Sequence, residues 1–215
     1  MDITVLASGR GSNLRAIARA IDEGRCRARI GAVVSDRSDA EALVFARERG
    51  IATHLCRPKD HADRGAWDAA LAEVVASTAP RLVVLAGFMR IVGPAVLARF
   101  PSAIINVHPA LLPSFPGAHA TVDAIAKGAR VSGCTVHQVD AGVDTGPILA
   151  QAAVPVLPTD DAASLHARIQ VQEHALLPAV IDAIARGWIV PGERPSFSPD
   201  CPFSSSGSLV CPALG

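Results

Sequence analysis

The sequence lacks an excess of charge of either sign, because 20 lysines and arginines stand against 20 aspartates and glutamates in 215 residues. A protein that binds nucleic acid through a broad electrostatic field needs a basic surplus, so the balance argues against that class. Only 19% of the residues are charged and 50% are hydrophobic, which excludes disorder for most of the chain. The length predicts one large domain, or one domain with an appendage.

Long apolar runs and cysteine pairs are missing as well. No hydrophobic run approaches the ~18 residues that a membrane span requires, and the first residues lack the basic region of a secretion signal. The 5 cysteines include no Cys-x-x-Cys pair, which favours reduced thiols over a disulfide framework or a zinc site. We therefore expect a cytoplasmic protein that binds neither a metal nor a membrane.

Two hydrophobic periods alternate through the first hundred residues. Short runs rich in β-branched residues are separated by segments with helical spacing, which predicts β-α-β units around a parallel sheet. The runs are apolar throughout, as buried parallel strands tend to be. We expect strands at 3–7, 30–34, 51–55, 82–86 and 103–107.

The second half of the chain follows a different pattern. A loop rich in proline and glycine at 109–117 precedes a short helix near 119–128. Two stretches of alternating hydrophobicity, at 131–139 and 148–156, predict antiparallel strands at the sheet edge. A long helix is expected at 160–186, opened by acidic residues that cap its N-terminus.

These elements predict an α/β fold. The expected architecture is a Rossmann-like, open, twisted and mostly parallel sheet flanked by helices, with antiparallel strands added at one edge. Residues 1–190 would form a single domain. Residues 191–215 are rich in serine, proline and glycine without any period, so we expect a flexible C-terminal tail there.

The turn after the first expected strand places glycines at the start of a helix. Gly11, Ser12 and Asn13 would present backbone N–H groups and polar side chains to an anion such as a phosphate. A Walker loop would need a lysine here, and the dinucleotide fingerprint would need a third glycine where Leu14 stands. The alternative is an ordinary tight turn with a helix cap, and the coincidence of strand, glycines and helix start favours phosphate binding.

An amide and an imidazole stand at the end of the last expected parallel strand. Strand alternation puts Asn106 and His108 on one face, about 7 Å apart. The carboxyl ends of such strands are where open α/β sheets bind their ligands. An amide beside an imidazole can hold a developing oxyanion and deliver a proton. A purely structural role for His108 stays open at this point.

Two further segments carry acidic residues. The glycine-rich turn at 139–147 contains Asp140 and Asp144, and its spacing alone favours a solvated loop. If the turn folded over the strand end, Asp144 would pair with His108. Gln170 and Glu173 lie three positions apart on the long helix and therefore on one face. The residue pattern by itself assigns that face to solvent.

Together the segments 8–14, 87–94, 105–117, 139–147 and 170–178 resemble, in order, the folate-dependent formyltransferase family. Within that family the resemblance is to phosphoribosylglycinamide formyltransferase (glycinamide ribonucleotide transformylase) of de novo purine biosynthesis, and it covers about residues 1–190. It implies transfer of the formyl group of the co-substrate 10-formyltetrahydrofolate to the amine of glycinamide ribonucleotide (phosphoribosylglycinamide). The products would be N-formylglycinamide ribonucleotide and tetrahydrofolate, formed without a metal.

The resemblance also implies roles for individual residues. Asn106 and His108 would stabilise the oxyanion, His108 would protonate the departing folate nitrogen, and Asp144 would help relay that proton through water. The residues expected to bind the ribonucleotide are Gly11, Ser12, Asn13, Gln170 and Glu173. The residues expected to bind the folate are Arg64, Met89, Arg90, Ile91, Val92, Asn106, Asp140, Ala141, Gly142, Val143 and Asp144.

Two alternative functions remain. A formyltetrahydrofolate hydrolase resembles the chain over the same catalytic segments but uses water as the nucleophile. A non-catalytic nucleotide-binding module would use only the glycine-rich turn, which leaves the combination of Asn106, His108 and Asp144 unexplained. The expected partners are small-molecule substrates, with no nucleic acid and no membrane, and the protein would be a monomer or a homodimer.

Overall fold

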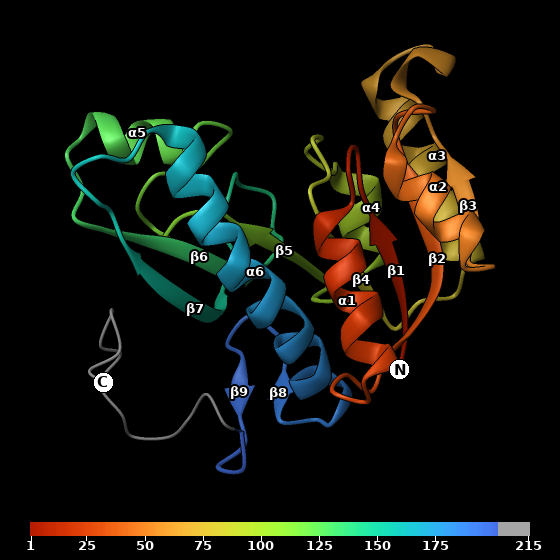
Figure 1. The fold of residues 1–215 in the computed structure, drawn as a ribbon. Helices are drawn as coiled ribbons and strands as arrows, with labels where there is room; N and C mark the ends of the chain where they lie inside the picture. The colour runs from red at the N-terminus through yellow and green to blue at the C-terminus, as the bar shows by residue number, and fades with distance from the viewer. Residues whose placement is uncertain (202–215) are drawn as a thin grey trace. The chain divides into compact units, whose positions relative to one another are not determined.

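The computed structural model describes residues 1–201, which fall into two compact units, Met1–Asn106 and the chain from Val107 onward (Figure 1). We describe each unit by itself. Within the described residues, no helix is both long and apolar enough to cross a membrane.

The first unit alternates strands and helices along a parallel sheet. β1 pairs with β2 and with β4, β2 pairs with β3, and β4 pairs with β5, all in parallel. The carboxyl ends of these strands therefore meet at one edge. The elements are β1 (Asp2–Leu6), α1 (Ser12–Asp22), β2 (Arg29–Ser35), α2 (Glu41–Glu48), β3 (Ala52–Leu55), η1 (Pro58–Asp60), α3 (Arg64–Ser77), β4 (Leu82–Leu85), α4 (Pro94–Arg99) and β5 (Ile104–His108).

The five expected strands are confirmed, each within one or two residues of its predicted bounds. The side chains of β1, β4 and β5 are mostly buried, as the continuous apolar runs predict: Val5, Val84 and Ile105 are completely inaccessible to solvent. The same expectation is wrong for β3, which pairs with β2 alone in this unit and has no buried residue. The helix that follows β1 buries Leu14 and Ile17 at helical spacing. The periodicity of the sequence thus determines which residues form this core.

The second unit contains an antiparallel hairpin and the long helix, as predicted. β6 (Val131–Gln138) pairs antiparallel with β7 (Ile148–Pro155). The short helix is α5 (Ala120–Ala126), and α6 (Ala162–Ala185) packs against both strands of the hairpin.

Acidic side chains set the start of α6. Asp161 is the N-cap: its Oδ1 accepts from the backbone N–H of Ser164 at 2.7 Å, and the Ser164 hydroxyl accepts from the Asp161 N–H at 3.0 Å. This reciprocal capping box satisfies two donors that the helix leaves unpaired. The neighbouring Asp160 forms an ion pair with Arg168 at 2.6 Å. The expected acidic cap is therefore confirmed.

The chain after α6 forms a second small sheet. β8 (Ile189–Val190) pairs antiparallel with β9 (Ser196–Phe197), although the sequence predicts a flexible tail from residue 191. The backbone N–H of Ser198 also donates to the carbonyl of Trp188 at 2.7 Å. These ladder contacts order residues whose composition alone indicates a loose segment. The rest of the expected tail, 202–215, lies outside the described residues.

Candidate functional site

A carboxylate between two buried histidines is the most distinctive feature of the second unit. Asp144 Oδ2 lies 3.4 Å from His108 Nδ1, and Asp144 Oδ1 lies 3.5 Å from His137 Nε2. His108 and His137 are 4% and 2% exposed. Asp144 also accepts a hydrogen bond of 2.8 Å from the backbone N–H of Gly117. The predicted approach of Asp144 to His108 is thus present, with a second histidine on the other side.

The contacts of Asp144 and His108 determine which of their atoms carry protons. His137, the Gly117 N–H and the positive charge of an imidazolium at His108 together lower the pKa of Asp144 to about 2, against an opposing effect of burial. Asp144 is therefore a carboxylate at neutral pH. His108 Nε2 lies 2.8 Å from the carbonyl oxygen of Phe115, which can only accept, so Nε2 carries a proton. Its Nδ1 faces the carboxylate.

The loop that follows β5 is fastened to the hairpin by two polar side chains. The Thr135 hydroxyl donates to the Ala110 carbonyl at 2.7 Å and accepts from the Leu112 N–H at 3.0 Å. Gln151 Nε2 donates to the Leu112 carbonyl at 2.9 Å and to the Thr135 hydroxyl at 3.0 Å. Because Thr135 is completely buried, these bonds are shielded from water. They fix the segment that carries the Phe115 carbonyl near His108.

The turn that carries Asp144 has a tightly constrained backbone. A Cβ on Gly146 would lie 1.9 Å from the Gln138 carbonyl oxygen, so only glycine fits there. Asp140 Oδ1 accepts from the Thr145 hydroxyl at 2.7 Å and from the Gly142 N–H at 3.1 Å. Asp144 itself adopts a left-handed conformation with φ of 56°. The turn is hydrogen-bonded internally, and its exposed residues are Asp140, Ala141, Gly142, Val143 and Thr145.

The N-terminus of α1, in the first unit, is where the sequence predicts an anion site. Gly11 is the residue before the helix and has a left-handed backbone with φ of 70°. A Cβ there would lie 2.9 Å from the Cβ of Ala42, which adds a steric requirement for glycine. No acidic residue stands in the first turn of α1, and Asn13 is buried while Ser12 is half-buried. The helix end thus offers N–H groups and the helix dipole to an anion.

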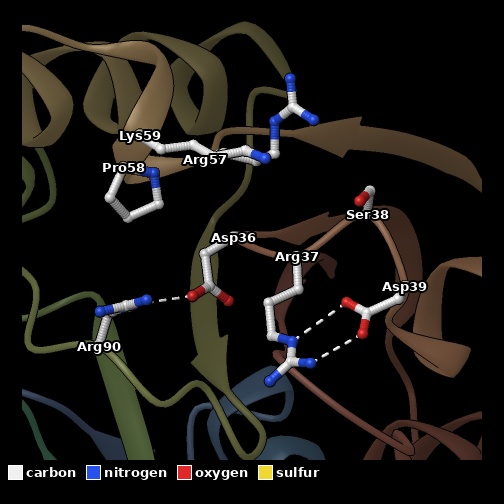
Figure 2. Close-up of a pocket in the computed structure, with 8 residues that line it drawn as sticks. All are labelled: Asp36, Arg37, Ser38, Asp39, Arg57, Pro58, Lys59 and Arg90. Atoms are coloured by element: carbon white, nitrogen blue, oxygen red, sulfur yellow. Dashed lines mark hydrogen bonds and ion pairs between the residues drawn. The ribbon is translucent and has the colours of Figure 1, made fainter.

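A hydrogen-bonded chain holds the segment 89–92 in the first unit. The Ser8 hydroxyl accepts from the Met89 N–H at 2.9 Å and donates to Asp36 Oδ1 at 2.6 Å. Asp36 Oδ2 accepts from Arg90 Nε at 2.9 Å (Figure 2). The Asp36 side chain is only 1% exposed, so this carboxylate is a shielded anchor. It positions both the backbone at residue 89 and the guanidinium of Arg90.

The remaining predicted folate residues lie at the same segment of the first unit. Arg64 begins α3 and its guanidinium donates to the carbonyl of Ile91. Met89 and Ile91 are 77% and 55% exposed, whereas Val92 is buried. Exposed apolar side chains of this size beside a fixed backbone are typical of a surface that receives an apolar ligand.

The two predicted residues of α6 differ in burial. Gln170 is half-buried, and Glu173 is only 4% exposed, so the assignment of this face to solvent is wrong for Glu173. Burial and, to a smaller extent, the negative charge of Glu173 together raise the pKa of the Cys134 thiol on β6 to about 12. Glu173 therefore projects toward β6, because α6 packs on the hairpin.

The structure brings some of the predicted site residues together, and it shows further residues at the site that the sequence does not predict. His108 and Asp144 come together, and Asn106 lies two positions before His108 on β5, half-buried. His137 and Thr135 were not predicted, because nothing local in the sequence of β6 signals their contacts with Asp144 and with the loop after β5. Ser8 and Asp36 were missed because nothing local signals their contact with Arg90. Among residues 1–201, no group of three histidine, cysteine or acidic side chains is arranged to hold a metal ion.

Comparisons with known proteins place this geometry in a family. Residues 1–181 match the family model described as formyl transferase. A phosphoribosylglycinamide formyltransferase from Mycobacterium tuberculosis is 51% identical over 183 residues, 85% of this chain and 84% of that protein. The Escherichia coli protein of the same name is 42% identical over 187 residues, 87% and 88% of the two chains.

The solved structures give the same result. The crystal structure of glycinamide ribonucleotide transformylase 1 from Symbiobacterium toebii matches with a TM-score of 0.88 at 46% sequence identity, over 92% of this chain and 93% of that chain. The likeness extends over the fold and over most of the sequence, and it includes the segments that carry the site.

Proposed function

The chain belongs to the formyl transferase family, and we infer that it transfers the formyl group of 10-formyltetrahydrofolate to the amine of glycinamide ribonucleotide. The products are N-formylglycinamide ribonucleotide and tetrahydrofolate, and the reaction belongs to purine biosynthesis. The observation that carries this function is the ionised Asp144 held between buried His108 and His137 at the end of β5.

The reaction needs a proton to move between two nitrogens. The amine nitrogen attacks the formyl carbon, a C–N bond forms, and the carbonyl electron pair moves to oxygen. When this tetrahedral intermediate collapses, the bond from carbon to the folate nitrogen breaks, and that nitrogen takes a proton as the amine loses one. A site for this reaction must stabilise an oxyanion and supply an acid.

We assign these tasks to three residues. Asn106 and His108 stand two positions apart on one strand, which directs them to the same face, and there they stabilise the oxyanion. His108 protonates the departing folate nitrogen, and its pairing with a carboxylate favours the charged ring that can give up a proton. Asp144 stabilises the imidazolium and, through water, helps to return a proton.

We assign the remaining predicted residues to the binding of the two substrates. The N-terminus of α1 at Gly11, Ser12 and Asn13 binds the ribonucleotide phosphate, since it combines N–H donors with the positive end of a helix dipole. Gln170 and Glu173 of α6 bind the same substrate, with Glu173 directed to the glycinamide amine. The folate is bound by the turn 140–144, by Asn106 and by the fixed segment from Met89 to Val92 with Arg64.

The last part of the proposal concerns the domain, the compartment and the partners of the chain. We propose that residues 1–190 act as one formyltransferase domain in the cytoplasm and that 191–215 take no part in the reaction. The partners are the two small-molecule substrates, and the protein acts as a monomer or a homodimer.

One assay separates this function from its alternative. Purified protein is mixed with 10-formyltetrahydrofolate, and the formation of tetrahydrofolate is followed with and without glycinamide ribonucleotide. We expect turnover only with the ribonucleotide, together with formylated product in equal amount. Turnover that ignores the ribonucleotide would instead assign the chain as a formyltetrahydrofolate hydrolase, and no turnover under either condition would contradict both activities.

A further inference from the structure

A buried amide connects the Asp144 turn, residues 139–147, to the chain that follows α6. Gln138 is the last residue of β6 and is only 4% exposed. Its Nε2 donates to the Gly192 carbonyl at 3.0 Å, and its Oε1 accepts from the Gly192 N–H at 2.7 Å. Because a buried amide is unfavourable unless its donor and its acceptor are paired, this double contact explains how a glutamine is accommodated at this position.

The backbone of Gln138 contacts both ends of the Asp144 turn. Its N–H donates to the Pro147 carbonyl at 2.9 Å, just before β7 begins. Its carbonyl accepts from His137 Nδ1 at 2.7 Å. A Cβ on Gly146 would lie 1.9 Å from the same carbonyl oxygen, so the returning end of the turn lies directly against it. A displacement of Gln138 would therefore move the turn and the His137 ring together.

The contacts of Asp144 are sensitive to such a displacement. Its carboxylate oxygens lie 3.4 Å from His108 Nδ1 and 3.5 Å from His137 Nε2, distances beyond which a hydrogen bond is lost. The turn is exposed over residues 140–143, so packing holds that part only weakly. The side chain of Gln138 supplies a buried point of attachment at the base of the turn.

The partner of Gln138 is itself held in place. Gly192 lies in the chain between β8 and β9, which pair with each other in antiparallel orientation. The Ser198 N–H donates to the Trp188 carbonyl at 2.7 Å and extends this pairing by one further bond. Because a two-stranded sheet is only marginally stable alone, the contact with Gln138 also fastens the small sheet to β6.

We propose that Gln138 is a positioning residue for the proposed reaction, which holds the Asp144 turn and the His137 ring in place beside His108 through its paired contact with Gly192. This inference rests on the proposed function, because Asp144 and His108 have their assigned roles only in formyl transfer. Gly192 contributes backbone groups that act through Gln138, and it takes no part in the chemical steps.

Steady-state kinetics of Gln138→Met test this role. Methionine has a similar length and fills the same space, but it cannot pair with the Gly192 backbone. We expect kcat to fall by about 3- to 10-fold, the value of one ordinary hydrogen bond. The KM for the ribonucleotide should change by less than about twofold, because its assigned residues lie on α1 and α6. Val190→Ala is the control: it removes an exposed side chain from β8 and should leave kcat unchanged.

Gly192→Pro tests the same contact from its other side. Proline removes the N–H from which Gln138 Oε1 accepts and leaves the carbonyl in place. We expect kcat to fall in this variant too, and an unchanged kcat would contradict the proposal even if Gln138→Met failed to fold. Gln138→Met/Gly192→Pro should be no slower than Gln138→Met alone, because both substitutions act on one contact. Additive effects would overturn the proposal.

Hydrogen exchange measured by NMR gives a readout without turnover. The Gly117 N–H donates to Asp144 Oδ2, so its exchange rate reports whether the turn stays in place. In Gln138→Met this amide should exchange about 5- to 10-fold faster, as the loss of one hydrogen bond implies. The Leu112 N–H, which donates to the Thr135 hydroxyl, is the internal reference and should keep its rate.

The outcomes separate a positioning role from a purely structural one. Unchanged exchange at Gly117, or equal acceleration at Gly117 and Leu112, would overturn the proposal. A Gln138→Met protein that is less stable but keeps the kcat of the unaltered protein would overturn it as well. If the unaltered protein shows no formyl transfer, the proposed function fails, whereas faster exchange at Gly117 alone still supports the attachment of the turn through Gln138.

Discussion

His137 Nε2 lies 3.5 Å from Asp144 Oδ1, on the side of the carboxylate opposite His108. Its other ring nitrogen, Nδ1, lies 2.7 Å from the Gln138 carbonyl, which can only accept, so Nδ1 carries a proton. When Nε2 carries a proton as well, it donates to the carboxylate and the ring is held at both nitrogens; the ring is only 2% exposed. His137 therefore holds the carboxylate that pairs with His108, which makes it a positioning residue for the proposed reaction.

Replacing Asp144 by asparagine tests the central carboxylate. The amide keeps the shape but removes the charge opposite the His108 imidazolium, so kcat should fall by at least about 100-fold, the usual contribution of a general acid. The pH optimum of kcat should shift, and the KM for the folate should change by less than about threefold, since the substitution is isosteric. Steady-state kinetics between pH 5 and 9 check this, and unchanged rates would remove Asp144 from the mechanism.

The same carboxylate contributes to stability in a defined pH range. The pKa of Asp144 is lowered from 3.8 to about 2 in the folded protein, so its contribution is fully present above 3.8. It is lost as the pH falls through about 2, because protonation is then required in both states. With a side chain only 13% exposed, the contribution is about 2 kcal/mol. Denaturant unfolding should show the free-energy gap between the unaltered protein and Asp144→Asn shrinking by that amount from pH 7 to pH 2.

His137→Gln tests the positioning role. Loss of the imidazole next to Asp144 should lower kcat by about 10-fold while both KM values change by less than about twofold, because the buried ring acts through the carboxylate. The double variant His137→Gln/Asp144→Asn should be no slower than Asp144→Asn alone, since His137 acts through that carboxylate. His166→Gln, a half-buried histidine of the same unit, is the control. Additive effects of the two substitutions would contradict the coupling.

Gly11→Ala tests the anion site at α1. An added Cβ would meet Ala42 at 2.9 Å on a backbone with φ of 70°, so the turn must shift. We expect a loss of about 1–2 kcal/mol in unfolding free energy and a higher KM for the ribonucleotide, with the KM for the folate unchanged. Gly9→Ala is the matched control, because a Cβ there meets no atom within 4 Å and should alter stability by less than about 0.5 kcal/mol. Equal KM values in both variants would contradict phosphate binding at this turn.

Asp36→Asn tests the anchor of the segment 89–92. Without its charge, the residue no longer pairs with Arg90 and holds the Ser8 hydroxyl less firmly. The KM for 10-formyltetrahydrofolate should rise by about 3- to 10-fold, the value of one ordinary hydrogen bond, because the amide keeps part of the contact. Asp39→Asn is the control, because it removes an exposed carboxylate that pairs with Arg37. The KM for the folate should stay the same in this variant. Identical behaviour of the two variants would show that Asp36 does not position the segment.

Much of the fold follows from the sequence because apolar periodicity determines burial. The strand bounds of both halves, the hairpin and the long helix agree with the pattern of hydrophobic residues and caps. Short pairing contacts such as β8 with β9 do not, since two-residue strands carry no periodic signal. The roles of the site residues are predictions that the experiments above test.

The sequence by itself determined that Gly11 opens a helix and that Asn106 and His108 end a buried strand, because glycine conformation and strand alternation are local properties. Only the tertiary structure decided what surrounds His108. Asp144 reaches it through a turn with a left-handed backbone, and His137 arrives from β6, so three separate segments must pack before these charges meet. Glu173 is buried only because α6 packs on the hairpin. The hydrogen bonds of Asp36 to Ser8 and Arg90 likewise form only when separate segments pack together. Periodicity specifies which side chains leave water, whereas the distances between polar groups are set by how the elements pack.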